Sequence, residues 1–450
     1  MSDFSVIEAT LVASQQSKKD VEVDLRSNVV DMTIYEHLQK PWVDARLVVI
    51  DDMGLKDKLN VQGVERFRIT FGSNEDPASP LFTKFFFISR VNDSQKINER
   101  ADLLALELVE DHVYANAMKQ ISRSYDTTIE DMIEQIMFNE LGKTVVRNQF
   151  EGVAQGPRKI IVPYLSPLEA IAWVKDRATT KTGGPLFLHG SLYTNNLIMS
   201  DFDSLMRQPV VNEKFPLRYT EANNSIDQDD DALSDYYNID AFKEQAVDDM
   251  LGMYENGNIG SFYSNIDAGT GLTAGDHVSV RDIIDEFYTN NLIDPRSAQT
   301  VFDPTLTIQG KLSDDYDAVN VFQVTSSNMY NQFQSYHDEA ILLDENDNLI
   351  ESQLKIKNKI IRAILKKNVI DISMSGKMFG EGQIGVGNRV RLMFLGSSPN
   401  DNGDILDQLD KRKSGDYLIM AISHNFKEEV HNASLRLTKI GELPQDVTLE

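Results

Sequence analysis

The amino-acid sequence predicts an α+β protein with several domains, in which a β-rich region lies near each end and helical segments lie between them. Short runs of branched and aromatic residues, separated by turn formers, fill residues 21–109 and again 369–440. Two helix start signals fall between residues 119 and 200. With 450 residues the chain is long enough for two to four domains.

The N-terminal region reads as β structure. Between residues 66 and 71 apolar and polar side chains alternate, as expected of a strand with one face in water, and Leu104, Leu106 and Leu108 repeat this period of two. Several short strands at this spacing indicate a barrel or a sandwich. The strands are predicted at 21–25, 45–50, 65–71, 84–90 and 101–109.

Residues 119–200 read as a mixed α/β unit. Thr127 and Glu130 have the spacing of a capping box, and Gly142 stands where a helix C-cap belongs. A second helix is predicted after Ser166, with Pro167 at its first turn and Glu169 at the third position. The first helix would bury one apolar face, made of Ile129, Ile133, Ile136 and Met137.

The second half of the chain is more varied. Residues 221–240 are acidic and poor in apolar side chains, which indicates a surface excursion, and Asp240 is predicted to cap a helix over 241–257. An amphipathic helix with a basic outer face is predicted at 353–367. Strands follow at 369–375, 388–394, 416–426 and 432–440, and the last two are expected to pair antiparallel.

The composition and net charge exclude several kinds of site and partner. The net charge is −26, so most of the surface would repel a polyanion such as nucleic acid. The chain has no cysteine, which excludes disulfides, thiolate metal sites and cysteine nucleophiles. No apolar run is long enough to span a membrane, and the N-terminus lacks the features of a signal peptide.

The motifs that imitate known chemistry are weak. Gly380, Gly382 and Gly385 spell the dinucleotide fingerprint, but a strand rather than a helix is predicted after them, so we interpret them as a turn between strands. Residues 227–238 and 343–351 imitate calcium loops but lack the required glycine.

The seven histidines also give no recognisable site. His337 and Asp338 are adjacent, but the sequence has no nucleophile elbow to act with them. His424 is predicted to lie on the same face of its strand as several apolar residues, which indicates a structural role. None of the histidines has metal-ligand spacing; they stand at positions 37, 112, 189, 277, 337, 424 and 431. We therefore predict no catalytic, no cofactor-binding and no metal-binding residues, and no cofactor.

The order of these segments resembles the baseplate hub proteins of contractile-tailed bacteriophages, which are related to the hub half of type VI secretion spikes. The likeness is carried by residues 27–71, with Asp52, Gly54 and Leu55 in a recurring pattern, by the helical stretches 123–137 and 162–178, and by the closing strands from 382 onward, which include the family's strand-borne histidine at His424. Residues 221–345 depart most from the family.

The resemblance implies a non-enzymatic homotrimer with two tube-like antiparallel β-barrel domains in each copy and inserted helical α/β domains. Three copies would form a ring that adapts the sixfold tail tube to the threefold central spike and leaves a channel for DNA. The domains expected are 1–118 (first barrel), 119–200 (mixed α/β), 201–240 plus 301–445 (second, discontinuous barrel) and 241–300 (helical or irregular insert).

The partners implied are the central spike protein, the tail tube protein, the tape measure protein and other baseplate subunits. DNA would pass without specific binding, and no membrane anchor is expected. The location would be the tail baseplate of the virion, after assembly in the host bacterial cytoplasm.

Two other functions stay open from the residues alone. The chain could be a tail-associated cell-wall hydrolase that uses paired carboxylates, because such pairs leave weak signatures in sequence. It could also be a calcium-dependent binding module, although the two candidate loops depart from the required spacing.

Overall fold

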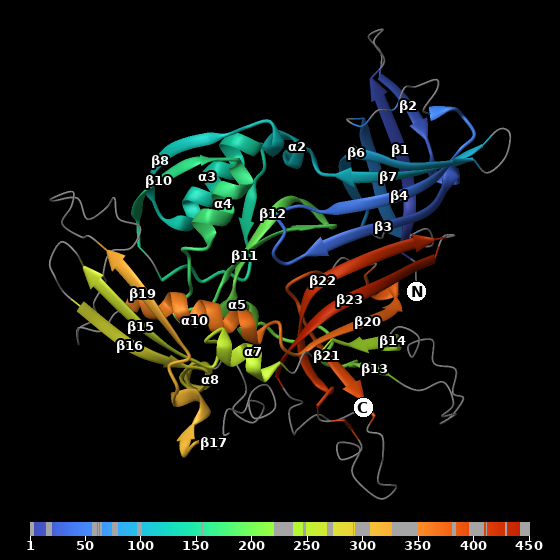
Figure 1. Cartoon of the computed structure of the whole chain (residues 1–450). Helices are drawn as coiled ribbons and strands as arrows, with labels where there is room; N and C mark the ends of the chain where they lie inside the picture. The colour runs from blue at the N-terminus through green and yellow to red at the C-terminus, as the bar shows by residue number, and fades with distance from the viewer. Residues whose placement is uncertain are drawn as a thin grey trace, which may run out of the picture.

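Strands dominate the computed structural model of the chain (Figure 1), and most of them pair antiparallel. The structure describes residues 4–14, 20–55, 61, 63, 65–73, 80–96, 101–154, 156–219, 237–245, 249–267, 273–290, 292, 307–325, 350–379, 384–395, 409–410, 412–427 and 430–441. No helix within these ranges has the length and apolar character needed to cross a membrane.

One sheet of 13 strands, in the described residues, runs through both β-rich regions. Its order is β14-β20-β23-β22-β3-β4-β7-β6-β5-β1-β2, and β21 branches from β22 to pair with β13. Its N-terminal half contains β1 (Phe4–Ser14), β2 (Asp20–Asp24), β3 (Val29–His37), β4 (Asp44–Asp51), β5 (Arg66–Ser73), β6 (Phe82–Lys96) and β7 (Asp102–Val109), with the 3₁₀ turn η1 (Arg26–Asn28) before β3.

The C-terminal half of the same sheet includes the four strands predicted between residues 369 and 440, together with two strands that the sequence did not predict. It contains β13 (Leu217–Tyr219), β14 (Ile239–Glu244), β20 (Val369–Ser375), β21 (Arg389–Phe394), β22 (Gly415–Lys427) and β23 (Val430–Gly441), with η4 (Gly376–Phe379) after β20. The predicted antiparallel pairing of the last two strands is confirmed.

Neither half is closed by a ladder among the described strands. In the C-terminal half a single bridge, between Arg218 and Asn238, links β13 to the start of β14. The predicted α+β class, with antiparallel sheets and helices between them, is confirmed. Closure of each half into a barrel stays a prediction.

The mixed unit after the first β region is built as the cap signals predict. It contains α2 (Asp111–Ala117), β8 (Ile121–Thr127), α3 (Ile129–Leu141), β9 (Val145–Arg147), β10 (Arg158–Leu165), α4 (Pro167–Lys175), β11 (Leu186–Ser191), β12 (Thr194–Asp201) and α5 (Phe202–Arg207). Ser166 and Glu169 form the predicted capping box of α4, and Gly142 ends α3 in the left-handed conformation. The cap of α3 is one residue later than predicted, because Thr128 accepts the hydrogen bond from the Asp131 amide.

A third group of elements packs beside the C-terminal half. It contains α7 (Met250–Glu255), β15 (Gly260–Asp267), β16 (Thr273–Ser279), α8 (Val280–Thr289), β17 (Thr307–Ile308), β18 (Lys311–Leu312), η2 (Ser313–Asp315), β19 (Val319–Thr325) and α10 (Ile350–Ile364). β15 pairs with β16 and with β19, so this small sheet includes strands from both sides of residue 300.

One predicted helix is wrong. Residues 239–244 form the edge strand β14, and the helix begins only at Met250, with Asp249 as its cap. Phe242 lies opposite Ile372 of β20, and its ring packs against Tyr219 and Phe394. Contacts with these distant residues override the local helical pattern.

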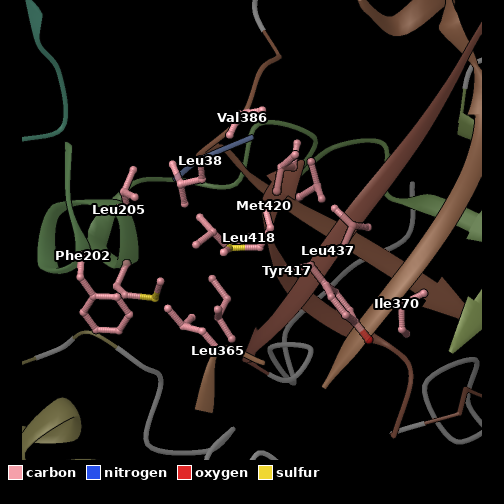
Figure 2. Close-up of a cluster of buried hydrophobic side chains, with 14 of the residues drawn as sticks. Leu38, Phe202, Leu205, Leu365, Ile370, Val386, Tyr417, Leu418, Met420 and Leu437 are labelled. Atoms are coloured by element: carbon pink, nitrogen blue, oxygen red, sulfur yellow. The ribbon is translucent and has the colours of Figure 1, made fainter. Parts of the chain in front are cut away.

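Three hydrophobic cores stabilise the molecule. The first lies inside the N-terminal half, where Phe67, Ile69 and Phe71 are fully buried as the alternation predicts. The second lies around α3 and α4, and the third lies under the C-terminal half and its neighbouring helices. Figure 2 shows part of the third core, in which Leu418 and Met420 of β22 lie among side chains from α5 and from the turn after α10.

Candidate functional site: the seam between the two halves of the long sheet

The two halves of the long sheet meet at one pair of strands, which we call the seam. β22 pairs antiparallel with β23 on one edge and with β3 on the other, in a register that runs from Ala421 opposite His37 to Lys427 opposite Asp31. The backbone amide of Leu38 extends this ladder by donating to the Met420 carbonyl at 2.9 Å. Backbone hydrogen bonds therefore join segments from opposite ends of the chain into one surface.

A chain of buried charged and polar groups lies under the seam. The His424 Nε2 atom of β22 lies 3.3 Å from the Glu36 Oε2 atom of β3, and the His424 Nδ1 atom lies 3.1 Å from His431 Nε2 of β23. His424 is 0% exposed and Glu36 is 1% exposed. The three side chains come from the three strands that meet here, so each contact crosses from one strand to the next.

The mixed α/β unit is attached to the same group. The second oxygen of Glu36 accepts a hydrogen bond from the backbone amide of Leu192, in the turn after β11. Next to this turn, a Cβ atom at Gly190 would lie 2.9 Å from the backbone of Trp42, so only glycine allows the approach. Glu36 thus connects both halves of the sheet to the α/β unit.

A buried ion pair lies next to this group. Lys84 Nζ of β6 lies 3.1 Å from Glu110 Oε1, and both side chains are 1% exposed. The other oxygen of Glu110 accepts from the Val43 amide at 2.9 Å. The positive charge of Lys84 also acts on Glu36, so the two pairs form one electrostatic network.

Aromatic rings hold the histidines in place. The His431 ring stacks on Phe426 with a centroid distance of 4.3 Å, and Phe379 meets His424 edge to face at 5.1 Å. A Cβ atom at Gly376 would lie 2.0 Å from the His431 ring, so this position also requires glycine. The imidazoles therefore have no room to change rotamer without moving the backbone.

The pKa values follow from this packing. Burial raises the pKa of Glu36, but the hydrogen bond and charge of His424, with help from the Leu192 amide and Lys84, bring that pKa below its usual value. Burial and the neighbouring His424 hold the pKa of His431 well below its usual value. Near neutral pH the network therefore contains an ionised Glu36 and a neutral His431.

The burial of this network limits what its groups can contact. An enzyme's acid or base must touch its substrate, and neither Glu36 nor His424 presents any surface to solvent that a substrate could reach. The described residues also contain no cluster of three or more His, Asp or Glu side chains that could hold a metal ion. What the network can do is fix the position of the two halves relative to each other and to the α/β unit.

Some residues discussed from the sequence can be located, and others cannot. The predicted structural role of His424 is confirmed by its burial and its two ring contacts. Gly387, just after the glycine motif, turns the chain with φ near 90°, and β21 follows directly, as predicted. Three groups of residues discussed from the sequence lie outside the described residues. They are Gly380 and Gly382 of the glycine motif, most of the two calcium-loop candidates (227–236 and 343–349), and the pair at 337–338.

The remaining described histidines are not brought together with this pair. His112 contacts the Pro41 carbonyl at 2.7 Å, His189 the Gly190 carbonyl, and His277 the Asp317 carboxylate at 2.6 Å. His37, at the end of the seam ladder, accepts a hydrogen bond from the Gln39 amide at 3.0 Å. Of the described histidines, only His424 and His431 are brought into contact with each other.

The sequence reasoning missed Glu36, Lys84 and His431. The alternation of buried residues contained a signal for two of them, because Glu36 follows Met32 and Ile34 on the buried face of β3, and Lys84 precedes Phe86 on the buried face of β6. A charged residue on the buried face of a strand needs a partner of opposite charge or a hydrogen bond. The identity of each partner depends on strand pairing and could not be inferred locally.

Comparisons with known proteins identify solved structures of similar fold. No protein-family model matches the chain, and no curated protein sequence matches it. The structure matches the tail protein from Neisseria meningitidis MC58 with a TM-score of 0.53 and 12% identity, covering 97% of each chain. It matches the 43 kDa tail protein of prophage MuSo2 from Shewanella oneidensis with a TM-score of 0.52 and 11% identity, covering 96% of this chain and 98% of that one.

A third match is an Escherichia coli component of the type VI secretion system, with a TM-score of 0.43 and 8% identity, over 94% of this chain and 77% of that one. The two matches of higher score span nearly the whole of both chains, so the agreement extends beyond a single shared motif. The chain therefore has the fold of these phage tail proteins, and the likeness to hub-like tail proteins noted in the sequence is confirmed at the level of fold.

Proposed function

We propose that this protein is a non-enzymatic structural hub of a contractile phage tail baseplate. In this role three copies form a ring that adapts the sixfold tail tube to the threefold central spike and leaves a channel for DNA. The fold it shares with phage tail proteins supports a structural role in a tail.

The observation that carries the proposal is the seam. Two β-rich halves of one chain are held side by side in a single sheet by the β3–β22 ladder and by the buried network beneath it. Each copy would thus offer two similar units with a fixed spacing, and three copies would offer six. A closed ring of this kind requires a different complementary surface on each flank of the subunit.

Closure of each half into a barrel, and the division into domains, are part of the proposal. The bridge between β13 and the start of β14 supports closure of the C-terminal half. The proposed division is 1–118, 119–200, 201–240 plus 301–445, and 241–300, and it is supported by the second core, whose buried residues all lie within 119–200. The third core includes side chains from the inserted segment, so that segment would be anchored to the second barrel.

The proposed partners are the central spike, the tail tube protein, the tape measure protein and other baseplate subunits. The complex would be part of the virion after assembly in the host cytoplasm. We also propose that the inner wall of the ring is predominantly acidic, because a net charge of −26 per chain would let DNA pass without adhering. A reconstruction of the assembled ring with a basic inner wall would exclude this part of the proposal.

The oligomeric state tests the main proposal. Analytical ultracentrifugation of the purified chain, alone and with the spike protein of the same virus, should give a species of about 150 kDa or its spike complex, three times the 50.8 kDa chain. Negative-stain images should then show rings with a central hole. A monomer under both conditions, or compact particles without a hole, would exclude the ring.

The non-enzymatic role needs a separate test. A peptidoglycan-clearing assay with the same preparation is expected to show no activity. Reproducible clearing that is lost on substitution of a single carboxylate would favour the hydrolase instead.

A further inference from the structure

A short turn, η4, lies over the two histidines of the seam. A Cβ atom at Gly376 would lie 2.0 Å from the His431 ring, so the backbone of the turn rests directly on that imidazole. The Phe379 ring meets the His424 ring edge to face at 5.1 Å and the His431 ring at 6.1 Å. Phe379 is fully buried. The turn therefore fits closely against both imidazoles.

The same turn contacts the other parts of the molecule. It packs against β1 of the N-terminal half and against β23 of the C-terminal half. The hydroxyl group of Tyr193, in the turn before β12 of the α/β unit, donates to the Phe379 carbonyl at 3.0 Å. Because η4 is a 3₁₀ turn and takes no part in the β ladders of the described strands, it depends on contacts of this kind for its position.

The two facing ring nitrogens have room for one hydrogen atom. His424 Nδ1 and His431 Nε2 lie 3.1 Å apart, so one of them donates and the other accepts. A fully protonated imidazole carries a hydrogen on both nitrogens. With both rings in that form, two N–H groups would point at each other and two positive charges would meet in a buried site. The observed geometry therefore excludes full protonation of both rings.

Titratable and charged groups approach the pair from every element packed around it. Above pH 4.5 Glu36 stays ionised because its pKa is lowered, and Tyr193 stays neutral in acid because burial raises its pKa. Burial lowers the pKa of His189, and burial with the charge of His424 lowers that of His431, which a hydrogen bond with the Gly376 backbone only partly opposes. The groups are Glu36 of β3, Lys84 of β6, His189 of β11, Tyr193 of the following turn and Lys377 of η4 itself.

From this geometry we propose that η4 is an acid-operated latch over the histidine pair, closed at neutral pH and displaced when His424 and His431 are both fully protonated. The ladders of β22 with β3 and β23 hold the strands in place, so the His431 ring turns into the space that η4 vacates. The contact between Tyr193 and Phe379 is then lost, and with it one link to the α/β unit. The proposal is independent of the ring, because all of these groups belong to one chain.

A spin label on η4 tests the latch. The chain has no cysteine, so Lys377→Cys supplies a single attachment point on this turn. The same label at Lys243→Cys, at an exposed position of β14, is the matched control. As the pH falls from about 7.5 to about 4.5, the EPR line shape at position 377 should change from slow to fast motion, while the label at 243 and the far-UV circular dichroism stay unchanged. The samples are kept dilute, because the sequence pI is about 4.7.

Three variants in the labelled background identify the group responsible. His431→Gln cannot take up the proton, so the label should stay slow over the whole range. His189→Gln removes another buried histidine and should keep the transition. Tyr193→Phe removes the hydrogen bond to the Phe379 carbonyl, so its transition should move to higher pH by about half a unit.

A fourth variant provides a check that does not depend on replacing a histidine. The methyl group added by Gly376→Ala would collide with the His431 ring, so the label at 377 should move fast already at pH 7.5, with the label at 243 unchanged. Slow motion in this variant would overturn the proposal, because η4 would then tolerate a displaced ring.

Three further results would overturn it. The label at 377 could show no change down to about pH 4.5, or it could show the same transition in His431→Gln. The labels at 377 and 243 could also become mobile together with a loss of circular dichroism, which would mean general unfolding in acid instead of a local release.

Discussion

The seam and the basic outer face of α10 are built from the same kinds of charged side chain, but they differ in burial. At the seam Glu36, Lys84 and Glu110 are at most 1% exposed, and each is engaged by a charge of opposite sign or by a backbone amide. On the outer face of α10 the side chains of Lys359 and Lys366 are exposed to water. Buried charges must find partners within the chain, whereas exposed charges are solvated. The comparison predicts large stability effects at the seam and small ones on the outer face of α10.

The largest effect is expected when one partner of the buried ion pair is removed. Lys84→Met should lower the free energy of unfolding by about 3–5 kcal/mol, because the buried Glu110 would keep only the more distant Lys143 Nζ, at 3.8 Å, as a counter-charge. Urea unfolding measures this loss. The double variant Lys84→Met/Glu110→Gln should recover much of the stability, since it removes both charges of the pair. A loss below about 1 kcal/mol for the single variant would contradict the importance of the pair.

A smaller loss is expected at the centre of the seam. Glu36→Gln should cost about 1.5–3 kcal/mol, because the neutral amide can accept from Leu192 or face His424 but cannot satisfy both as the carboxylate does. The exposed carboxylate of Glu213, changed in the same way, serves as a control for the loss of one negative charge. If both variants unfold at the same urea concentration, the seam network adds nothing to stability.

The pH dependence of stability separates the two ends of the network. The pKa of His431 is lower in the folded state than its usual value of 6.5, so the contribution of His431 to stability is fully present above pH 6.5. Below that pH only the unfolded chain takes up the proton, and the contribution is lost. The pKa of Glu36 is also lower in the folded state than its usual value of 4.5, so the contribution of Glu36 to stability is present above pH 4.5 and is lost in stronger acid. The melting temperature should therefore decline in two stages.

Replacement of His431 isolates the first stage. The melting temperature of His431→Gln should decline less than that of the wild type between about pH 7.5 and pH 5.5. Some decline should remain, because burial also lowers the pKa values of His37 and His189. An unchanged decline would mean that His431 is not the titrating group. His277→Gln, at a half-exposed ion pair, provides the comparison.

The smallest effect on stability is expected on the exposed outer face of α10. Lys359→Gln/Lys366→Gln should change the free energy of unfolding by no more than about 0.5 kcal/mol, because both side chains are exposed to water. A loss above about 1 kcal/mol would show that the charges on this face of α10 stabilise the fold as those at the seam do.

Local patterns allowed much of the fold to be predicted. The alternation at 84–90 gave a strand that the structure extends to β6, and Ser166 with Glu169 gave the start of α4. These signals depend on neighbouring residues alone, so no tertiary contact is needed to interpret them. The helix expected over 241–257 was wrong in its first half because the pairing of β14 with β20 depends on residues more than a hundred positions away.

The candidate site was far less predictable. Only His424 was singled out beforehand, as a structural residue, and its partners Glu36 and His431 were not. Glu36 is separated from His424 by 388 positions in the sequence, and nothing local selects one buried partner over another at that range.

The sequence by itself determined the alternation of the strands, the caps of the main helices, the basic face of α10 and the overall acidity, because each of these is a property of adjacent residues or of composition. Only the tertiary structure decided that β22 pairs with β3, that two β regions form one sheet, and that Glu36, His424 and His431 meet beneath it. The physical reason is that strand pairing between distant segments is selected by the burial of whole faces and the satisfaction of backbone hydrogen bonds, which depend on the complete fold.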